Sequence, residues 1–163
     1  MKFIFFALFM LIFQTVVSQE KIVEEYPQAF IRALKEQKNV IFIFSHENCG
    51  WCRIFDRYHA DPDVKEILGK EYLIHKIDIS DTVSGKSLFE HYKLPGIPVW
   101  MIFNSKKELL SDGKYEDGDV VGYPIEPPGM EIYLEAIRRT SGHINEKQLQ
   151  LLGEKLVYFD KEY

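Results

Sequence analysis

A continuous apolar run between Asn39 and Ser45 dominates the hydrophobic pattern of this chain. Every residue inside the run is β-branched or aromatic, which is typical of a central strand buried on both faces. After it, Ile54, Phe55 and Tyr58 recur at helical spacing with polar residues between them. This spacing predicts an amphipathic helix that opens at the first cysteine of the chain. The pattern therefore predicts a junction between a buried strand and a helix.

Hydrophobic periodicity predicts the other elements as well. An apolar residue at every fourth position from Ile22 to Leu34 predicts one helix that continues to Gln37 and packs on a core. The segment 113–129 is rich in Gly, Pro, Asp and Glu, which predicts an irregular loop. Further helices are predicted over residues 61–70, 84–92, 130–139 and 145–159. Strands are predicted over residues 72–79 and 99–103, with a hairpin partner of the latter over residues 108–112.

The only two cysteines of the chain, Cys49 and Cys52, are three positions apart at the predicted strand-to-helix junction. Thiols at this spacing can form a disulfide, and after reduction one can attack a target disulfide while the other resolves the mixed disulfide. A helix N-terminus favours an anion, so we expect Cys49 to be the nucleophile and the more enclosed Cys52 to be the resolving thiol. His46 and Glu47 are candidates for tuning the pKa values of this pair.

Other uses of the cysteine pair fit the sequence less well. A zinc site needs two further ligands, but neither a second cysteine pair nor a His-x-x-x-His spacing follows. A purely structural disulfide around so short a loop would remove little entropy from the unfolded chain. The acidic residues Glu116, Asp117 and Asp119 lack the alternating spacing of a calcium loop. We therefore expect neither a metal nor a cofactor.

The N-terminal residues predict export. Lys2 is followed by an apolar run from Phe3 to Phe13 and then by a mixture of small and polar residues up to Ser18, which is the pattern of a secretory signal peptide cleaved after residue 18. The apolar run is shorter than the roughly 20 residues of a membrane span. We therefore expect no stable membrane anchor after cleavage, with an uncleaved anchor as the alternative. Residues 19–163 are then a single domain in the periplasm or the secreted space.

Charge and compartment narrow the choice of partners. The chain carries 25 acidic and 20 basic residues and contains no basic cluster, which argues against nucleic acid as a partner. In an oxidising compartment a lone cysteine pair rests as a disulfide unless a dedicated partner reduces it. That redox partner would therefore decide the direction of any reaction.

Taken together, the order of elements resembles the thioredoxin fold. The segment Cys49–Cys52, with the sequence Cys-Gly-Trp-Cys, matches the active-site motif of that family, Lys76–Asp78 matches its second central strand, and Tyr92–Val99 matches the segment that holds its cis-proline. The resemblance covers about residues 21–139. It implies an α/β fold with a central mixed β-sheet flanked by helices. The extra C-terminal helix predicted within residues 143–163 has no counterpart in the minimal fold.

The resemblance also implies how a substrate would bind. Pro98 would be cis and lie against the dithiol, and the backbone of Ile97 would pair with an extended peptide by strand addition. Trp51 would be half-exposed between the cysteines, where its ring could contact the substrate. The alternative for Trp51 is that it packs on the 113–129 loop.

Three positions depart from the family's cytosolic reductases. Trp51 stands where they usually have proline, and Asn48 stands where they have tryptophan. Ile43 replaces their buried acid six positions before the first cysteine, so Glu47, His46 or water would have to accept the proton of the resolving thiol. Exported thioredoxin-like proteins with Cys-Gly-Trp-Cys are more similar to this chain.

These observations predict a monomeric thiol–disulfide oxidoreductase that reduces disulfide-bearing protein substrates and is itself served by a redox partner. The oxidase and isomerase directions of the same chemistry are alternatives. A different class of function is a redox-inert module that binds extended polypeptide. A metal-delivery thiol pair is a third alternative.

Overall fold

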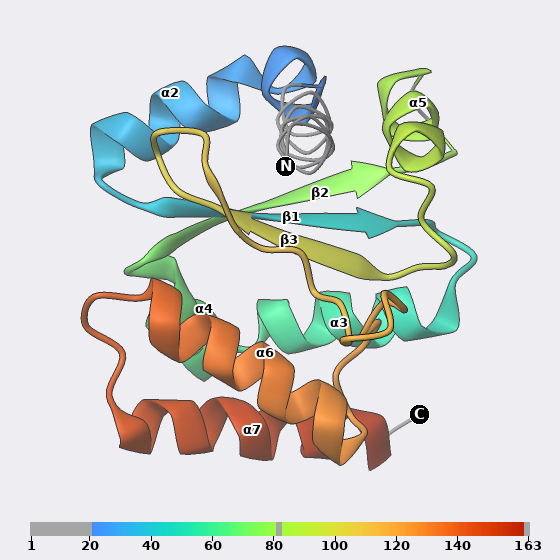
Figure 1. Ribbon diagram of the computed structural model, residues 1–163. Coiled ribbons are helices and arrows are strands. Elements are labelled where there is room, and N and C mark those ends of the chain that lie inside the picture. Colours follow the sequence, from blue (N-terminus) through green and yellow to red (C-terminus); the bar gives the residue numbers. More distant parts are fainter. Residues whose placement is uncertain (1–20, 81–82, 162–163) are drawn as a thin grey trace, which may run out of the picture.

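A four-stranded mixed sheet forms the centre of the computed structural model, which describes residues 21–80 and 83–161 (Figure 1). The signal peptide predicted at residues 1–18 lies outside the described residues. The strands of the sheet are β1 (Asn39–Ser45), β2 (Tyr72–Asp78), β3 (Val99–Phe103) and β4 (Leu109–Ser111). The strand order is β2-β1-β3-β4; β1 is parallel to β2 and antiparallel to β3, and β3 and β4 form an antiparallel hairpin.

Helices cover both faces of this sheet. They are α2 (Pro27–Glu36), α3 (Gly50–Ala60), α4 (Pro62–Gly69), α5 (Val83–His91), α6 (Pro127–Thr140) and α7 (Glu146–Lys161). In Figure 1, α2 and α5 lie on one face, whereas α3, α4 and α6 lie on the other with α7 outside them. Among the described residues, no helix is both long and apolar enough to cross a membrane.

The sheet separates two hydrophobic cores. Along β1, Phe42 and Phe44 belong to the core under α2 and α5, while Ile41 and Ile43 belong to the core under α3, α4, α6 and α7. Successive side chains of a strand point to opposite faces, so a strand between two cores must be apolar at every position. This explains the continuous apolar run in the sequence and confirms it as a central strand.

The predicted first helix is interrupted. Residues 21–25 are helical, Tyr26 is not, and Pro27 begins α2. Proline lacks the N–H that a continuous helix would use, and it disfavours helical geometry in the residue before it. Within α2 itself Phe30 and Ala33 are buried, whereas Leu34, which we expected on the core-facing stripe, is 64% exposed. The prediction of one helix to residue 37 was therefore wrong.

Two side-chain caps fix helix starts where the sequence predicts them. The Asp61 side chain accepts hydrogen bonds from the N–H groups of Asp63 and Val64, at 3.0 and 3.2 Å, at the start of α4. Asn145 and Gln148 exchange side-chain-to-backbone hydrogen bonds, both at 3.0 Å, at the start of α7. Each cap pairs donors that a helix start leaves unpaired.

The loop predicted over 113–129 is shorter than expected. Helix α6 begins at Pro127 rather than at Met130, because proline is well suited to the first helical position. Gly113 opens the loop with a φ of +63°, and a Cβ at this residue would lie 2.6 Å from the Trp100 carbonyl oxygen. Only glycine allows the chain to turn this close to β3.

The C-terminal helix α7 belongs to the core. Lys155 of α7 donates hydrogen bonds to the carboxylates of Asp61 and Asp63, with N–O distances of 2.8 and 2.9 Å. Its buried face joins the same cluster as α3, α4 and α6 through Leu149, Leu152 and Leu156.

Candidate functional site

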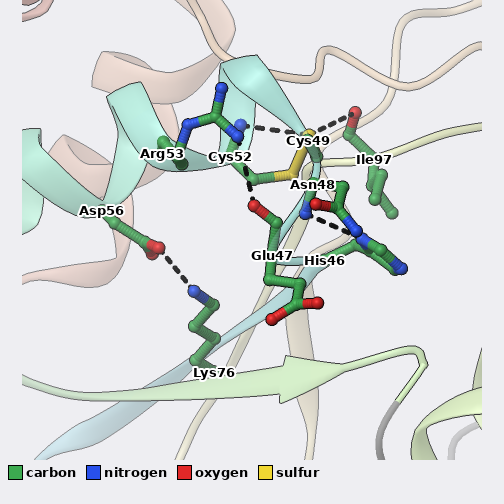
Figure 2. Close-up of a disulfide and its surroundings, with 9 residues drawn as sticks. All are labelled: His46, Glu47, Asn48, Cys49, Cys52, Arg53, Asp56, Lys76 and Ile97. Atoms are coloured by element: carbon green, nitrogen blue, oxygen red, sulfur yellow. Dashed lines mark hydrogen bonds and ion pairs between the residues drawn. A yellow bond between two sulfur atoms is a disulfide. The ribbon is translucent and has the colours of Figure 1, made fainter.

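Cys49 and Cys52 form a disulfide where β1 leads into α3 (Figure 2). Cys49 is the N-cap of α3, and its Sγ accepts a hydrogen bond from the Cys52 N–H at 3.1 Å. The same N–H and the helix dipole would stabilise a thiolate on Cys49 after reduction. Cys49 is half-buried, whereas Cys52 is only 1% exposed. An incoming disulfide can therefore reach the first sulfur much more easily than the second.

The segment before β3 lies against this disulfide. The Ile97–Pro98 peptide bond is cis, and the Ile97 carbonyl oxygen is 3.8 Å from Cys49 Sγ (Figure 2). Within the described part of the chain, the Ile97 N–H has no hydrogen-bond partner. The structure thus brings together Cys49, Ile97 and Pro98, which are separated by almost 50 residues in sequence.

Trp51, between the two cysteines, is 47% exposed. One face of its indole stacks on Tyr123, with ring centroids 6.0 Å apart and planes 19° from parallel. From the sequence, Trp51 was expected either to be half-exposed or to pack on the 113–129 loop. In the structure it does both, because one side of the ring packs on the loop while the residue remains half-exposed. We expect the exposed side to contact a substrate.

Tyr123 is a part of the site that the sequence analysis missed. It is buried, its ring meets Phe55 edge to face, and its hydroxyl donates a 2.7 Å hydrogen bond to the Leu156 carbonyl oxygen in α7. Burial also raises the pKa of Tyr123 above its ordinary value. A tyrosine inside an irregular loop has no periodic neighbours, so nothing in the sequence assigns it to the support of Trp51.

The contacts of His46 and Glu47 are with the turn that precedes α3. His46 Nδ1 accepts the Asn48 N–H at 2.9 Å, and the His46 carbonyl accepts the Cys49 N–H at 3.1 Å. The Glu47 carbonyl accepts a hydrogen bond from Arg53 Nη1 at 3.1 Å, and its carboxylate points away from the disulfide (Figure 2). These two residues hold the turn in place, and their influence on the thiol pKa values stays a prediction.

An ion pair joins α3 to β2 beside the site. Asp56, one turn after Cys52, pairs with Lys76 (Figure 2). Both side chains are partly exposed, so the pair adds little to stability.

Ile43, at the position where the cytosolic reductases of the thioredoxin family have a buried acid, is itself buried in the core. In residues 21–80 and 83–161, no group of three or more metal-ligating side chains could hold a metal ion.

The order of the elements defines the fold class of this protein. The chain runs through β1, the Cys-x-x-Cys helix α3, α4, β2, α5, the cis-proline, β3, β4 and α6 around a β2-β1-β3-β4 sheet, and this is the order of the thioredoxin fold. A Cys-x-x-Cys disulfide at the N-terminus of the helix after a central strand is typical of a thioredoxin-like redox motif.

Comparison with known proteins found no matching protein-family model and no matching curated protein. Among solved structures, the chain is similar to a disulphide isomerase from Xylella fastidiosa Temecula1 (17% identity over 85% of this chain and 88% of the other, TM-score 0.49). It is also similar to the oxidised C-terminal domain of DsbD from Neisseria meningitidis (22% identity, 60% and 84% covered, TM-score 0.44). A thioredoxin from Thermus thermophilus matches with 27% identity over 47% of this chain and 59% of that chain, with a TM-score of 0.41. These scores are low, so the fold assignment rests on the topology of the chain itself.

Proposed function

We propose that this protein is a thiol–disulfide oxidoreductase that reduces disulfides in exported proteins. The observation that supports this most is the position of Cys49 Sγ, which is half-buried, capped by the Cys52 N–H at 3.1 Å and 3.8 Å from the Ile97 carbonyl oxygen. A sulfur that is both reachable and close to a helix N-terminus is suited to nucleophilic attack. A bond with a purely structural role would gain nothing from either property.

The reaction begins with the reduced form of the pair. The Cys49 thiolate attacks one sulfur of a substrate disulfide, forms a mixed disulfide and releases the other substrate sulfur as a thiolate, which takes up a proton. Cys52, after losing its proton, then attacks Cys49 Sγ and releases the second substrate thiolate. The substrate has gained two electrons, and the Cys49–Cys52 disulfide has formed again. A dithiol protein donor supplies two electrons for the next cycle.

Substrate would bind as an extended strand beside the disulfide. The Ile97 N–H, which has no partner among the described residues, and the Ile97 carbonyl are the backbone groups that strand addition requires. The exposed side of Trp51 would pack on the same segment of substrate, and Pro98 would hold Ile97 against Cys49. Main-chain pairing recognises any sequence, so this mode fits a protein that acts on several substrates.

The direction and the compartment are part of the proposal. The reductase direction follows from the resemblance to exported thioredoxin-like proteins with Cys-Gly-Trp-Cys, and export follows from the pattern of residues 1–18. Equilibration with glutathione tests the direction, because a reductase has a potential well below that of an oxidant. We expect a value closer to the roughly −270 mV of thioredoxin than to the roughly −120 mV of a strong oxidant of this fold.

Trapping tests the proposed chemistry. In Cys52→Ser the mixed disulfide cannot be resolved, so we expect this variant to accumulate a covalent adduct with a peptide disulfide through Cys49. Cys49→Ser is the matched control and should form no adduct. Equal adduct formation by both variants, or none by Cys52→Ser, would contradict the assigned roles.

A further inference from the structure

A groove of about 870 Å³ opens beside the disulfide site, between the cis-proline segment and the 113–129 loop. One wall is formed by Pro95 and Gly96, which directly precede Ile97. The opposite wall is formed by the loop and the first turn of α6. The lining is largely apolar and includes Tyr115, Val120, Pro95 and Pro128.

The charged residues that line this groove all have the same sign. None of the lining residues is basic. Lys114, which precedes the lining residue Tyr115 in the sequence, is paired with Asp112 at 3.3 Å. Within the described residues the four acidic side chains of the lining form no ion pair, and all four are exposed: Glu116, Asp117, Asp119 and Glu126.

The groove lies next to the site. A Cβ on Gly122 would lie 3.9 Å from the Pro98 carbonyl oxygen, so the loop that forms one wall rests directly on the cis-proline segment. On the other wall, Gly96 is adjacent to Ile97, whose carbonyl oxygen faces Cys49 Sγ. An extended chain advances about 3.3 Å per residue. A polypeptide paired with Ile97 would therefore enter the groove within a few residues of its target cysteine.

We propose that this groove binds an extended polypeptide segment that carries lysine or arginine, together with apolar side chains, close to the target cysteine. The inference rests on the proposed function and adds to it a class of substrate. Four exposed carboxylates attract a cationic segment and repel an acidic one, and this selects partners mainly through the rate of association. The apolar lining accommodates the aliphatic stems of lysine and arginine as well as their neighbours.

The test uses three synthetic peptides that share one intramolecular disulfide and differ only in the flanking residues, which are lysine, serine or glutamate. Reduced protein is mixed with each peptide at low salt, and the second-order rate of peptide reduction is measured. We expect the lysine peptide to react about tenfold faster than the serine peptide, and the glutamate peptide to react more slowly than serine. High salt should reduce these differences, since it screens exposed charges.

Two variants with the same change in net charge separate the groove from the rest of the surface. The groove variant replaces the four lining acids by their amides: Glu116→Gln, Asp117→Asn, Asp119→Asn and Glu126→Gln. The control variant makes four such changes elsewhere: Glu24→Gln, Glu36→Gln, Glu66→Gln and Glu154→Gln. We expect the groove variant to reduce the lysine and serine peptides at rates within about twofold of each other, and the control to keep the wild-type preference.

The outcomes distinguish this inference from the proposed function. If wild-type protein reduces all three peptides at the same rate, or if both variants lose the preference equally, the groove assignment is overturned while the oxidoreductase function stands. If no peptide is reduced, the proposed function fails. The groove can then still be tested by measuring how a lysine peptide without cysteine binds to the oxidised protein. The groove variant should bind this peptide more weakly than the control variant does. Equal binding would overturn the groove assignment.

Discussion

Trp51 rests on Tyr123, with ring centroids 6.0 Å apart and planes 19° from parallel. The residue between the two cysteines is thus held by a loop that follows β4, and the loop in turn is held by α7 through the hydrogen bond from Tyr123 to Leu156. The C-terminal helix, which has no counterpart in the minimal thioredoxin fold, therefore supports the surface around the disulfide.

Replacement of Tyr123 tests this support. Tyr123→Phe keeps the stacked ring and loses the hydroxyl, so the free energy of unfolding should fall by about 1 kcal/mol. Tyr123→Leu also removes the ring, so we expect a larger loss of roughly 2–4 kcal/mol and a red-shifted emission from Trp51. Urea unfolding and tryptophan fluorescence measure these effects, and the buried Trp100 can be accounted for with a Trp51→Phe reference. An unchanged spectrum in Tyr123→Leu would mean that the stack does not hold Trp51.

The reduced form should carry a stabilised thiolate on Cys49. The Cys52 N–H and the start of α3 favour the anion, so we expect the pKa of the Cys49 thiol to lie below the value of about 8.5 for a free thiol. Thiolate absorbance in Cys52→Ser reports Cys49 alone, and the same titration in urea supplies the reference. Identical titrations in the folded and unfolded states would contradict this account.

His46 and Glu47 have different expected effects on that titration. Glu47→Gln removes a negative charge two residues before Cys49 and should lower the pKa of the Cys49 thiol. His46→Ala removes the imidazole whose Nδ1 accepts the Asn48 N–H in the turn that positions Cys49, and should raise that pKa. The Glu47 carboxylate points away from the disulfide, so we expect the smaller effect from Glu47→Gln. Titrations that match wild type would exclude both side chains from tuning.

Stability should depend on pH through His59 on α3. Burial lowers the pKa of His59 from 6.5 to about 4, although its hydrogen bond to the Phe55 carbonyl acts in the opposite direction. Between these two pH values the unfolded chain binds a proton that the folded chain does not, so stability falls as the pH is lowered from 6.5 to about 4.

His59→Gln isolates this contribution. Glutamine does not titrate, so this variant should lose less stability over the same pH range, by a margin on the order of 2 kcal/mol. Urea unfolding of both proteins at several pH values measures it. The lowered pKa of half-buried His75 contributes equally to both proteins and cancels in the comparison. Parallel stability curves would show that His59 titrates normally.

Sequence patterns could predict those parts of the fold that depend on local chemistry. Neighbouring residues predict the strand Asn39–Ser45, the helix that starts at Asp61 and the position of Cys49 at a helix start. The interruption at Pro27 also depends on a single residue, but the apolar residues spaced by four positions on both sides of the proline predicted one continuous helix. A periodic pattern measures which face could be buried, and it does not register the missing N–H of a single residue.

Other parts of the site required the folded chain. The hydrogen bond from Tyr123 to Leu156 joins residues 33 positions apart, and the pair between Asp56 and Lys76 joins residues 20 positions apart. Neither contact has a periodic signature, because each depends on how whole elements pack. The acidic groove likewise forms only when the 113–129 loop folds over the cis-proline segment.

Insulin reduction in the presence of dithiothreitol tests the central claim most directly. Wild-type protein should accelerate the precipitation of reduced insulin strongly over the background, because the Cys49 thiolate attacks the insulin disulfides and dithiothreitol restores the dithiol. Cys49→Ser should match the background rate. Equal rates for wild type, Cys49→Ser and a blank would contradict the account and would favour a module that only binds extended polypeptide.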